Sequence, residues 1–173
     1  GIVRSWQDVR NFQRMTVLDN ILIANQGQSG ERLLKLFFMP WRVKKEEKEN
    51  LDKAMFYLKQ VGLLTKRLEI TRNLSYAEQK LLAIARLLTT GAEVLLLDEP
   101  SSGVDPNWVE RFMGIIRNLA ESGKTICIVE HNLEVVRSVS DTVYFMAEGR
   151  MIAHGSADEL MADPKLGESY FGV

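Results

Sequence analysis

The second half of the chain alternates between short apolar runs and amphipathic stretches. Three apolar runs have the length and composition of strands, at about 93–98, 124–130 and 141–147. Two amphipathic stretches between them have the length of helices, at about 106–121 and 132–138. A further strand at 150–154 follows the turn residues Glu148 and Gly149, and a helix begins at about Ser156. Strand–helix–strand units of this length predict right-handed crossovers and a parallel sheet.

Residues 16 to 90 have helical periodicity instead. Thr16 is placed to cap a helix, with Asp19 three residues later in a capping-box arrangement. Ser75 and Glu78 repeat that arrangement at the start of a helix that ends at Gly91. The helix between them, over 44–62, has an apolar stripe and Gly62 as its C-cap. The stripe consists of Leu51, Ala54, Met55, Leu58 and Val61.

Composition narrows the class of protein without indicating its chemistry. The 173 residues are 46% hydrophobic and 26% charged with a formal net charge of −1, which is typical of one ordinary globular domain. This balance suggests no electrostatic attraction to nucleic acid or an anionic membrane. The single cysteine, Cys127, makes no internal disulfide. The chain has neither a signal-peptide core nor an apolar run of membrane-spanning length, so we expect a cytoplasmic soluble protein.

The candidate chemistry lies where the apolar run Val94 to Leu97 ends. Two carboxylates, Asp98 and Glu99, follow it directly, and Pro100 breaks the strand. Open α/β sheets bind ligands at the C-terminal ends of their strands. In nucleotide hydrolases the first such acid holds Mg²⁺, and the next residue can handle water. A lone pair of acids is more often a charged strand end, so other motifs must decide.

That strand end is one of four motifs that stand in order along the chain: LSYAEQ, VLLLDEP, SSGVD and VEHN. They resemble the signature motif, Walker B strand, D-loop and switch histidine of the nucleotide-binding subunit of ABC transporters. The segment RSWQDVRNFQRMTVLDNI resembles that family's Q-loop and the start of its helical subdomain. The stretch over 26–63, together with VEHN and DPKLGESYFG, is most similar to the ATPase subunits of branched-chain amino-acid importers.

The resemblance implies an α/β chain with a partial P-loop NTPase (ABC ATPase) fold, in which a helical subdomain accompanies a parallel sheet core. It divides the chain into a Q-loop segment at 1–10, a helical subdomain with the signature motif at 11–90, and the C-terminal part of a RecA-like core at 91–173. The missing N-terminal strands are expected to leave one edge or face of the sheet open.

The resemblance also implies roles for single residues. Asp98 would anchor Mg²⁺ through its hydration shell, and Glu99 would act as general base toward the attacking water. Gln7 would sense the γ-phosphate and the metal, which makes it both a catalytic and a metal-site residue. His131 would donate a hydrogen bond to the γ-phosphate.

A second group of residues is implied to act across a dimer interface. Ser75 would reach the γ-phosphate of ATP bound on the opposite subunit, aided by the positive end of its helix. Tyr76, Ala77 and Glu78 complete this nucleotide-binding signature. Asp105 would lie at the interface and couple the two sites.

Two departures from the family pattern affect the expected activity. The chain contains no G-x-x-x-x-G-K-[ST] loop, which supplies backbone N–H groups and a lysine to the phosphates. Ala77 stands where the family prefers glycine. We therefore expect Mg²⁺ and ATP to serve the complete parent protein, and no nucleotide to bind tightly to this fragment.

The implied partners are a second ATPase subunit, identical or different, and membrane permease subunits at the inner face of the cell membrane, with no nucleic acid. Two other hypotheses stay open. The chain is a non-catalytic remnant or interaction module in the first, and an ABC ATPase for lipid export, DNA repair or translation in the second. His154 is assigned no role. The aromatic residues Phe37, Phe38 and Trp41 form a core or subdomain face, or a docking site for a membrane partner.

Overall fold

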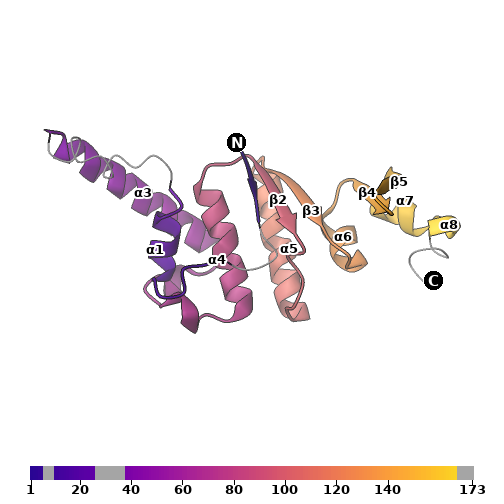
Figure 1. Cartoon of the computed structure of the whole chain (residues 1–173), viewed down its shortest axis with the longest axis horizontal. Helices are drawn as coiled ribbons and strands as arrows, with labels where there is room; N and C mark the ends of the chain where they lie inside the picture. Colours follow the sequence, from indigo (N-terminus) through magenta and orange to yellow (C-terminus); the bar gives the residue numbers. More distant parts are fainter. Residues whose placement is uncertain (6–9, 26–37, 167–173) are drawn as a thin grey trace. The chain divides into compact units, whose positions relative to one another are not determined.

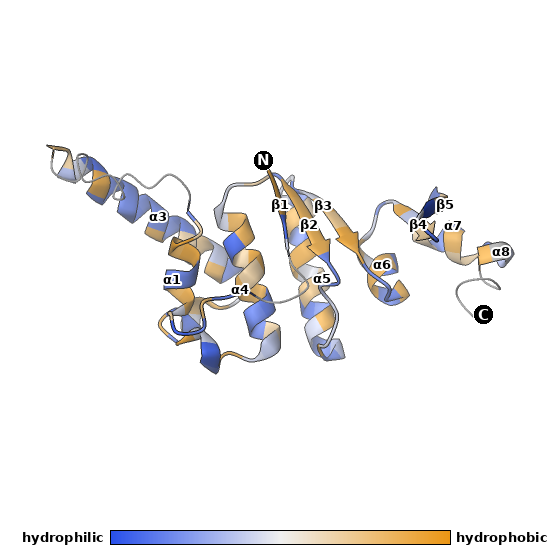
Figure 2. Cartoon of the chain, in the orientation of Figure 1, coloured by the Kyte–Doolittle hydropathy of each residue, from blue (hydrophilic) through white to orange (hydrophobic). Residues whose placement is uncertain are grey.

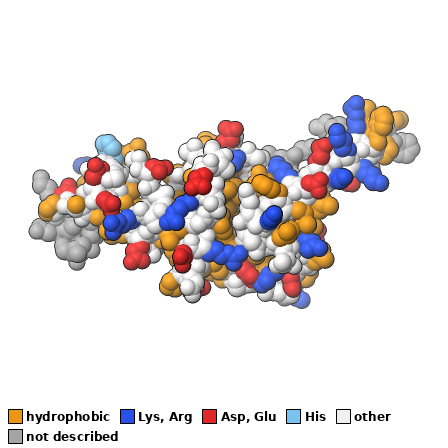
Figure 3. Space-filling model, turned by 180° about the vertical axis from the view of Figure 1, so that it is seen from behind, with side chains coloured by type: hydrophobic (Ala, Val, Ile, Leu, Met, Phe, Trp, Pro, Cys, Tyr) orange, Lys and Arg blue, Asp and Glu red, His pale blue; other side chains and the backbone are white. Residues whose placement is uncertain are grey.

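The computed structural model describes residues 1–5, 10–25 and 38–166 of the chain (Figure 1). These residues form two compact units, which comprise residues 1–129 and the described residues from 130 onward. Each unit is described by itself. Within the described ranges, every helix is too short or too polar to cross a membrane. Acidic and basic side chains are interspersed on the face drawn in Figure 3, as the net charge near zero suggests.

The first unit contains a parallel sheet with strand order β1-β2-β3. The strands are β1 (Ile2–Arg4), β2 (Val94–Asp98) and β3 (Thr125–Val129). Val94 pairs with Ile2 on one side and with Thr125 on the other, so the three strands end at the same edge. The predicted strands at 93–98 and 124–130 are confirmed, as is their parallel pairing. The apolar character of β2 and β3 is visible in Figure 2.

Burial differs between the two faces of β2. Leu95 and Leu97 are fully buried, whereas Val94 and Leu96 on the opposite face are half-buried. At the flanks of this sheet Ile2 is 68% and Val129 60% exposed. The face of β2 that carries Leu95 and Leu97 is therefore the more deeply packed of its two faces.

The helical part of the first unit contains α1 (Val17–Leu22), α3 (Pro40–Gln60) and α4 (Tyr76–Thr89), which pack against one another. Two short 3₁₀ turns, η2 (Leu64–Lys66) and η3 (Thr71–Asn73), connect α3 to α4. The core of this part is aliphatic and fully buried: Val17, Ile21, Ala54, Leu58, Leu81, Leu82, Ala85 and Leu88.

The helix ends follow the signals in the sequence. Thr16 and Ser75 cap α1 and α4, accepting hydrogen bonds from the amides of Asp19 and Glu78. Helix α3 begins at Pro40, earlier than predicted, because proline at the first position has a backbone already suited to a helix. Leu51, assigned to the apolar stripe of α3, is 40% exposed, so that part of the stripe does not face the core.

Helix α5 (Pro106–Glu121) follows the acidic strand end and contacts β3. Asp105 caps it by accepting a hydrogen bond from the amide of Trp108. One apolar face of α5 is buried: Trp108, Phe112, Ile115, Ile116 and Leu119. Its bounds match the predicted helix at 106–121.

The second unit begins with α6 (Leu133–Val139) and continues with the strands β4 (Val143–Ala147) and β5 (Arg150–Gly155). The strands pair antiparallel, as the predicted hairpin requires. Glu148 and Gly149 both have positive φ, which is typical of a tight two-residue hairpin turn. Two short helices follow, α7 (Ala157–Met161) and α8 (Pro164–Leu166).

Candidate functional site

The two carboxylates lie at the end of β2, where all three strands of the first unit terminate. The backbone amide of Asp98 donates a hydrogen bond to the hydroxyl of Ser5, at 3.0 Å. The amide of Glu99 donates to the carbonyl of Val129, at 2.9 Å. The backbone around the acid pair is therefore fixed from both neighbouring strands. This confirms that the pair stands at the C-terminal edge of a parallel sheet.

Arg4 is a neighbour of the site that sequence reasoning missed. Its Nη2 lies 2.9 Å from Oδ2 of Asp98, and 31% of the Asp98 side chain is exposed. Strand β1 is only three residues long, so no periodicity indicated it or the position of Arg4. A cation that binds Asp98 has to share the carboxylate with this guanidinium or displace it.

Glu99 has an unusual backbone, with φ of 42°. Side chains other than glycine seldom occupy this left-handed region, and strain of this kind costs on the order of 1–3 kcal/mol. The turn is closed by the amide of Ser102, which donates to the carbonyl of Glu99 at 3.2 Å. Such strain is concentrated at active sites, where the surrounding structure holds it.

The carboxylate of Asp98 is the candidate metal ligand at the acidic strand end. Among the described residues, no three His, Cys, Asp or Glu side chains gather into a metal-binding cluster. Mg²⁺ commonly uses one or two carboxylates and completes its shell with waters and substrate phosphates. The single strand-end carboxylate of Asp98 therefore fits a magnesium ion that arrives with a phosphate ligand.

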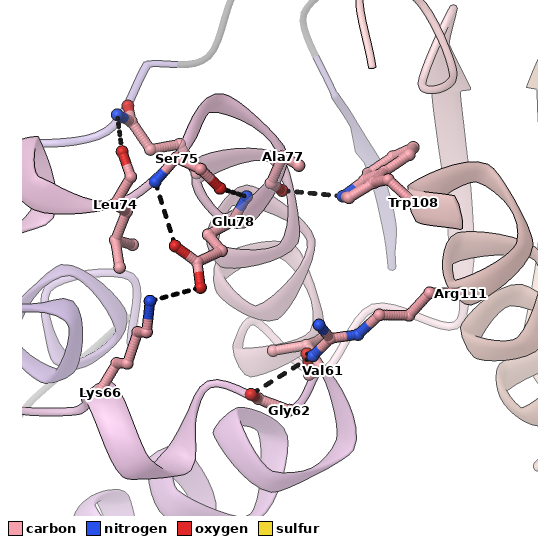
Figure 4. A network of polar contacts seen from close by, with 10 residues as sticks. Val61, Gly62, Lys66, Leu74, Ser75, Ala77, Glu78, Trp108 and Arg111 are labelled. Atoms are coloured by element: carbon pink, nitrogen blue, oxygen red, sulfur yellow. Dashed lines mark hydrogen bonds and ion pairs between the residues drawn. The ribbon is translucent and has the colours of Figure 1, made fainter. Parts of the chain in front are cut away.

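The start of α4 forms a second polar group, shown in Figure 4. The Ser75 hydroxyl accepts a hydrogen bond from the amide of Glu78, and the Glu78 carboxylate accepts one from the amide of Ser75 at 3.0 Å. Lys66 on η2 lies 2.7 Å from the other oxygen of this carboxylate. Burial raises the pKa of Glu78, but the Lys66 ammonium and the Ser75 amide outweigh it, and the net pKa is lowered.

This arrangement holds the glutamate in place at the helix start. Glu78 is engaged within the protein, whereas Tyr76 beside it is 47% exposed. The N-terminus of a helix carries partial positive charge and amide donors, which favour anionic ligands. Ser75, Tyr76, Ala77 and Glu78 lie together at this helix start, as their adjacency requires.

Helix α5 connects this helix start to the loop that carries Asp105. The indole Nε1 of Trp108 donates to the carbonyl of Ala77 at 3.0 Å (Figure 4). Gly103 has φ of +72°, and a Cβ there would lie 3.5 Å from the Tyr76 ring. Asp105 is thus brought near the signature residues through Trp108, and its own carboxylate is used to cap α5.

Arg111, one turn after Trp108 on α5, contacts the end of α3. Its Nη2 donates to the carbonyls of Val61 and Gly62, at 3.1 and 3.4 Å (Figure 4). A Cβ at Gly62 would lie 2.2 Å from this guanidinium nitrogen, and Gly62 has φ of +71°. Only glycine therefore fits here without a rearrangement.

The other candidate residues belong to other segments of the chain. Gln7 falls outside the described residues. His131 belongs to the second unit, directly before Asn132, whose side chain caps α6. His154, to which no role is assigned, stacks on Tyr144 across the β4–β5 hairpin, with ring centroids 5.9 Å apart.

Lys80 is a further residue that sequence reasoning missed. It lies on α4 between Ala77 and Ile84, at helical spacing from both, and is only 7% exposed. A lysine inside an apolar helix stripe was the available signal, because charged side chains are rarely buried without specific partners.

Comparisons with known proteins agree on one family. The family model described as "ABC transporter" matches residues 2–102. The high-affinity branched-chain amino acid transport ATP-binding protein LivG of Escherichia coli is 32% identical, over 99% of this chain and 68% of its own length. A probable LivG of Archaeoglobus fulgidus is 38% identical, over 100% of this chain and 66% of its own length.

The fold is similar to that of solved proteins. A crystal structure of an ATP-binding cassette of an ABC transporter, in its ADP conformation, has a TM-score of 0.79 and 33% identity. The match covers 100% of this chain and 69% of that one. The chain is thus similar along its whole length to about two-thirds of these relatives.

Proposed function

Because the chain belongs to the ABC transporter family of ATP-binding subunits, we propose that its acidic strand end hydrolyses ATP and thereby energises the uptake of branched-chain amino acids. The observation that carries the proposal is the placement of Asp98 and Glu99 at the shared end of three parallel strands. The strained backbone of Glu99 adds support, since such strain is concentrated at active sites.

The roles of the two acids follow from their chemistry. Asp98 would hold Mg²⁺ through its water shell, and the ion would neutralise phosphate charge when it is bound with ATP. Glu99 accepts the proton of the attacking water as general base. Gln7 would sense the γ-phosphate and the metal, and His131 would donate a hydrogen bond to that phosphate.

The second polar group acts on nucleotide from a neighbouring subunit. Ser75 and its neighbours Tyr76, Ala77 and Glu78 present a helix N-terminus to the γ-phosphate held by the opposite ATPase subunit. Asp105 lies at that subunit interface. The partner subunit is a second copy or a related chain, and both dock on permease subunits at the inner face of the cell membrane, without nucleic acid. Similarity to two LivG proteins supports this assembly.

Residues 1–173 alone are expected to bind Mg-ATP weakly or not at all. Its sequence contains no G-x-x-x-x-G-K-[ST] loop, which would supply the amide donors and lysine that hold the phosphates. Calorimetric titration of residues 1–173 with Mg-ATP measures this directly. Micromolar affinity would contradict the expectation and show that another segment replaces the loop.

A graft tests the proposed function. The part of E. coli LivG that aligns with this chain is replaced by residues 1–173, and the rest of LivG is kept. In cells that lack LivG, the graft should restore high-affinity leucine uptake, and Glu99→Gln in the graft should abolish it. Circular dichroism and co-purification with the transporter's membrane subunits establish folding and assembly.

The outcomes separate the two parts of the proposal. A folded, assembled graft without ATP hydrolysis would refute the ATPase role. A graft that hydrolyses ATP but restores no leucine uptake would refute the branched-chain amino-acid assignment alone.

A further inference from the structure

Lys80 is the only charged residue classed as buried in the described part of the chain, and it reaches from α4 to the loop after the acid pair. Its Nζ donates to the carbonyl of Pro100 at 3.0 Å and to the carbonyl of Ser102 at 2.5 Å. The Ser102 hydroxyl lies 3.4 Å away. Burying an ammonium group is unfavourable unless hydrogen bonds replace its water, and these carbonyls do so.

Two aromatic rings hold the ammonium in place. Lys80 Nζ lies 5.1 Å from the centroid of the Tyr76 ring and 5.8 Å from that of Trp108. Both distances are within the range of cation–π attraction. The Trp108 ring is itself fixed, because its indole donates to the Ala77 carbonyl and stacks on Phe112. Lys80 is therefore held in one position relative to the start of α4.

The loop that Lys80 contacts begins with the strained Glu99. The Ser102 amide closes the turn on the Glu99 carbonyl, and Lys80 holds the carbonyls of Pro100 and Ser102 within that same turn. A residue with positive φ keeps its conformation only where its surroundings fix it. The Lys80 hydrogen bonds and the Glu99–Val129 hydrogen bond fix the turn from opposite ends.

We propose that Lys80 is a positioning residue that holds the Glu99 turn in its hydrolytic geometry and ties it to the signature helix α4. The inference rests on the proposed function, because it takes Glu99 as the general base. Lys80 does not touch nucleotide in this role. It acts through the backbone of residues 99–102, so its loss slows the chemical step without weakening the binding of ATP.

The first experiment measures the turn itself in residues 1–173, without nucleotide. Amide hydrogen exchange is compared for the native chain, Lys80→Met and Lys80→Arg. Methionine has similar length but no donor, whereas arginine keeps the charge and the donors. Lys124→Met is the matched control, because Lys124 also donates to a backbone carbonyl, that of Ala92 at 2.8 Å, away from the Glu99 turn.

Lys80→Met should raise exchange in residues 99–105 by about tenfold or more, while the core amides of α4 and β2 keep their protection. Lys80→Arg should restore most of the protection, and Lys124→Met should leave residues 99–105 unchanged. Unchanged exchange in 99–105 for Lys80→Met would overturn the proposal, and so would an equal rise over the whole first unit. If Lys80→Met does not fold, Lys80→Leu, which also has no donor, takes its place under the same criteria.

The second experiment measures ATP hydrolysis in the LivG graft. Lys80→Met should lower kcat by about 10- to 100-fold and change KM for ATP less than about threefold, as expected for a misplaced catalytic group. Lys80→Arg should recover part of kcat, and Lys124→Met should match the unmodified graft. An unchanged kcat for Lys80→Met in an active graft would refute the role of Lys80. An inactive unmodified graft would refute the proposed function. The hydrogen-exchange result would then test only whether Lys80 holds the Glu99 turn in place.

Discussion

Replacing Glu78 by alanine removes two interactions at the start of α4 at once. The carboxylate accepts a hydrogen bond from the Ser75 amide and pairs with the Lys66 ammonium. Helix α4 carries a large share of the buried core of the first unit, so weakening its start should weaken the whole unit. We therefore expect Glu78→Ala to destabilise the first unit measurably.

The magnitude follows from the two contacts. The hydrogen bond to the Ser75 amide contributes about 0.5–1.5 kcal/mol. The ion pair contributes about 0.2–1 kcal/mol, because 44% of the Lys66 side chain is exposed and solvent screens it. Their sum, reduced slightly by the better helix propensity of alanine, is a loss of about 1–2 kcal/mol. Glu78→Gln keeps an acceptor for the amide but loses the ion pair, so its loss should be about half as large.

Urea unfolding followed by tryptophan fluorescence measures this loss. All three tryptophans of the chain fall within residues 1–129, so their emission reports on the first unit. The matched control is Glu159→Ala. Glu159 forms the same capping box with Ser156 at the start of α7 in the second unit. Glu159→Ala should leave the urea midpoint of the tryptophan-fluorescence transition unchanged.

The pH dependence supplies an independent check. The pKa of Glu78 is lowered in the folded state, so the unfolded chain binds more protons in the acid range. The stability that the carboxylate contributes is fully present above its unfolded pKa of about 4.3 and is lost as the pH falls through the lower folded pKa. The difference in the free energy of unfolding between the native chain and Glu78→Gln should therefore be largest at pH 7 and should disappear at acid pH. An equal difference in unfolding free energy at pH 7 and at acid pH would refute this account of the helix start. A Glu78→Ala variant as stable as the native chain would refute it as well.

Three further predictions concern the proposed ATPase and use the LivG graft. Glu99→Gln should keep ATP binding and lower hydrolysis by about 10²–10⁴-fold, because an amide cannot accept the proton of water; equal turnover in steady-state assays would remove Glu99 from the base role. Asp98→Asn should weaken nucleotide binding in the presence of Mg²⁺ but change it little in EDTA, and a titration with a fluorescent nucleotide measures both affinities. An equal loss of affinity with Mg²⁺ and with EDTA would contradict a metal-site role. Ala77→Gly should leave nucleotide binding unchanged and raise turnover, because the methyl group limits the approach of the helix start to phosphate; a fall in turnover would contradict this.

The features that the sequence predicted well are those encoded by neighbouring residues. The Ser75–Glu78 capping box, the cap at Thr16 and the bounds of α5 all depend on contacts within a few residues, and each is confirmed. The acid pair at the end of β2 was predictable for the same reason, because an apolar run followed by two carboxylates and a proline defines a strand end locally.

The features that were missed depend on contacts between distant segments. Arg4 pairs with Asp98 across 94 positions, and the strand that places it has three residues. Lys80 finds its carbonyl partners about 20 residues away, in a loop whose path no periodicity encodes. Leu51 was assigned to the buried stripe of α3 but is exposed. An apolar stripe predicts which face of a helix is buried, but it does not predict how much of the helix length other elements cover.

Three side chains connect the helical part of the first unit to the part that carries the acid pair. Lys80 reaches the Glu99 turn, Trp108 reaches the start of α4, and Arg111 reaches the end of α3. Trp108 and Arg111 lie on one face of α5, which begins only a few residues after Glu99 along the chain. Helix α4 is therefore joined to the loop after Glu99 through Lys80 and to α5 through Trp108. A shift of α4 along its axis has to move the Glu99 turn or break the hydrogen bonds of Lys80. If the proposed function holds, a phosphate that contacts the Ser75 helix start would thereby be coupled to the geometry of the general base within one subunit.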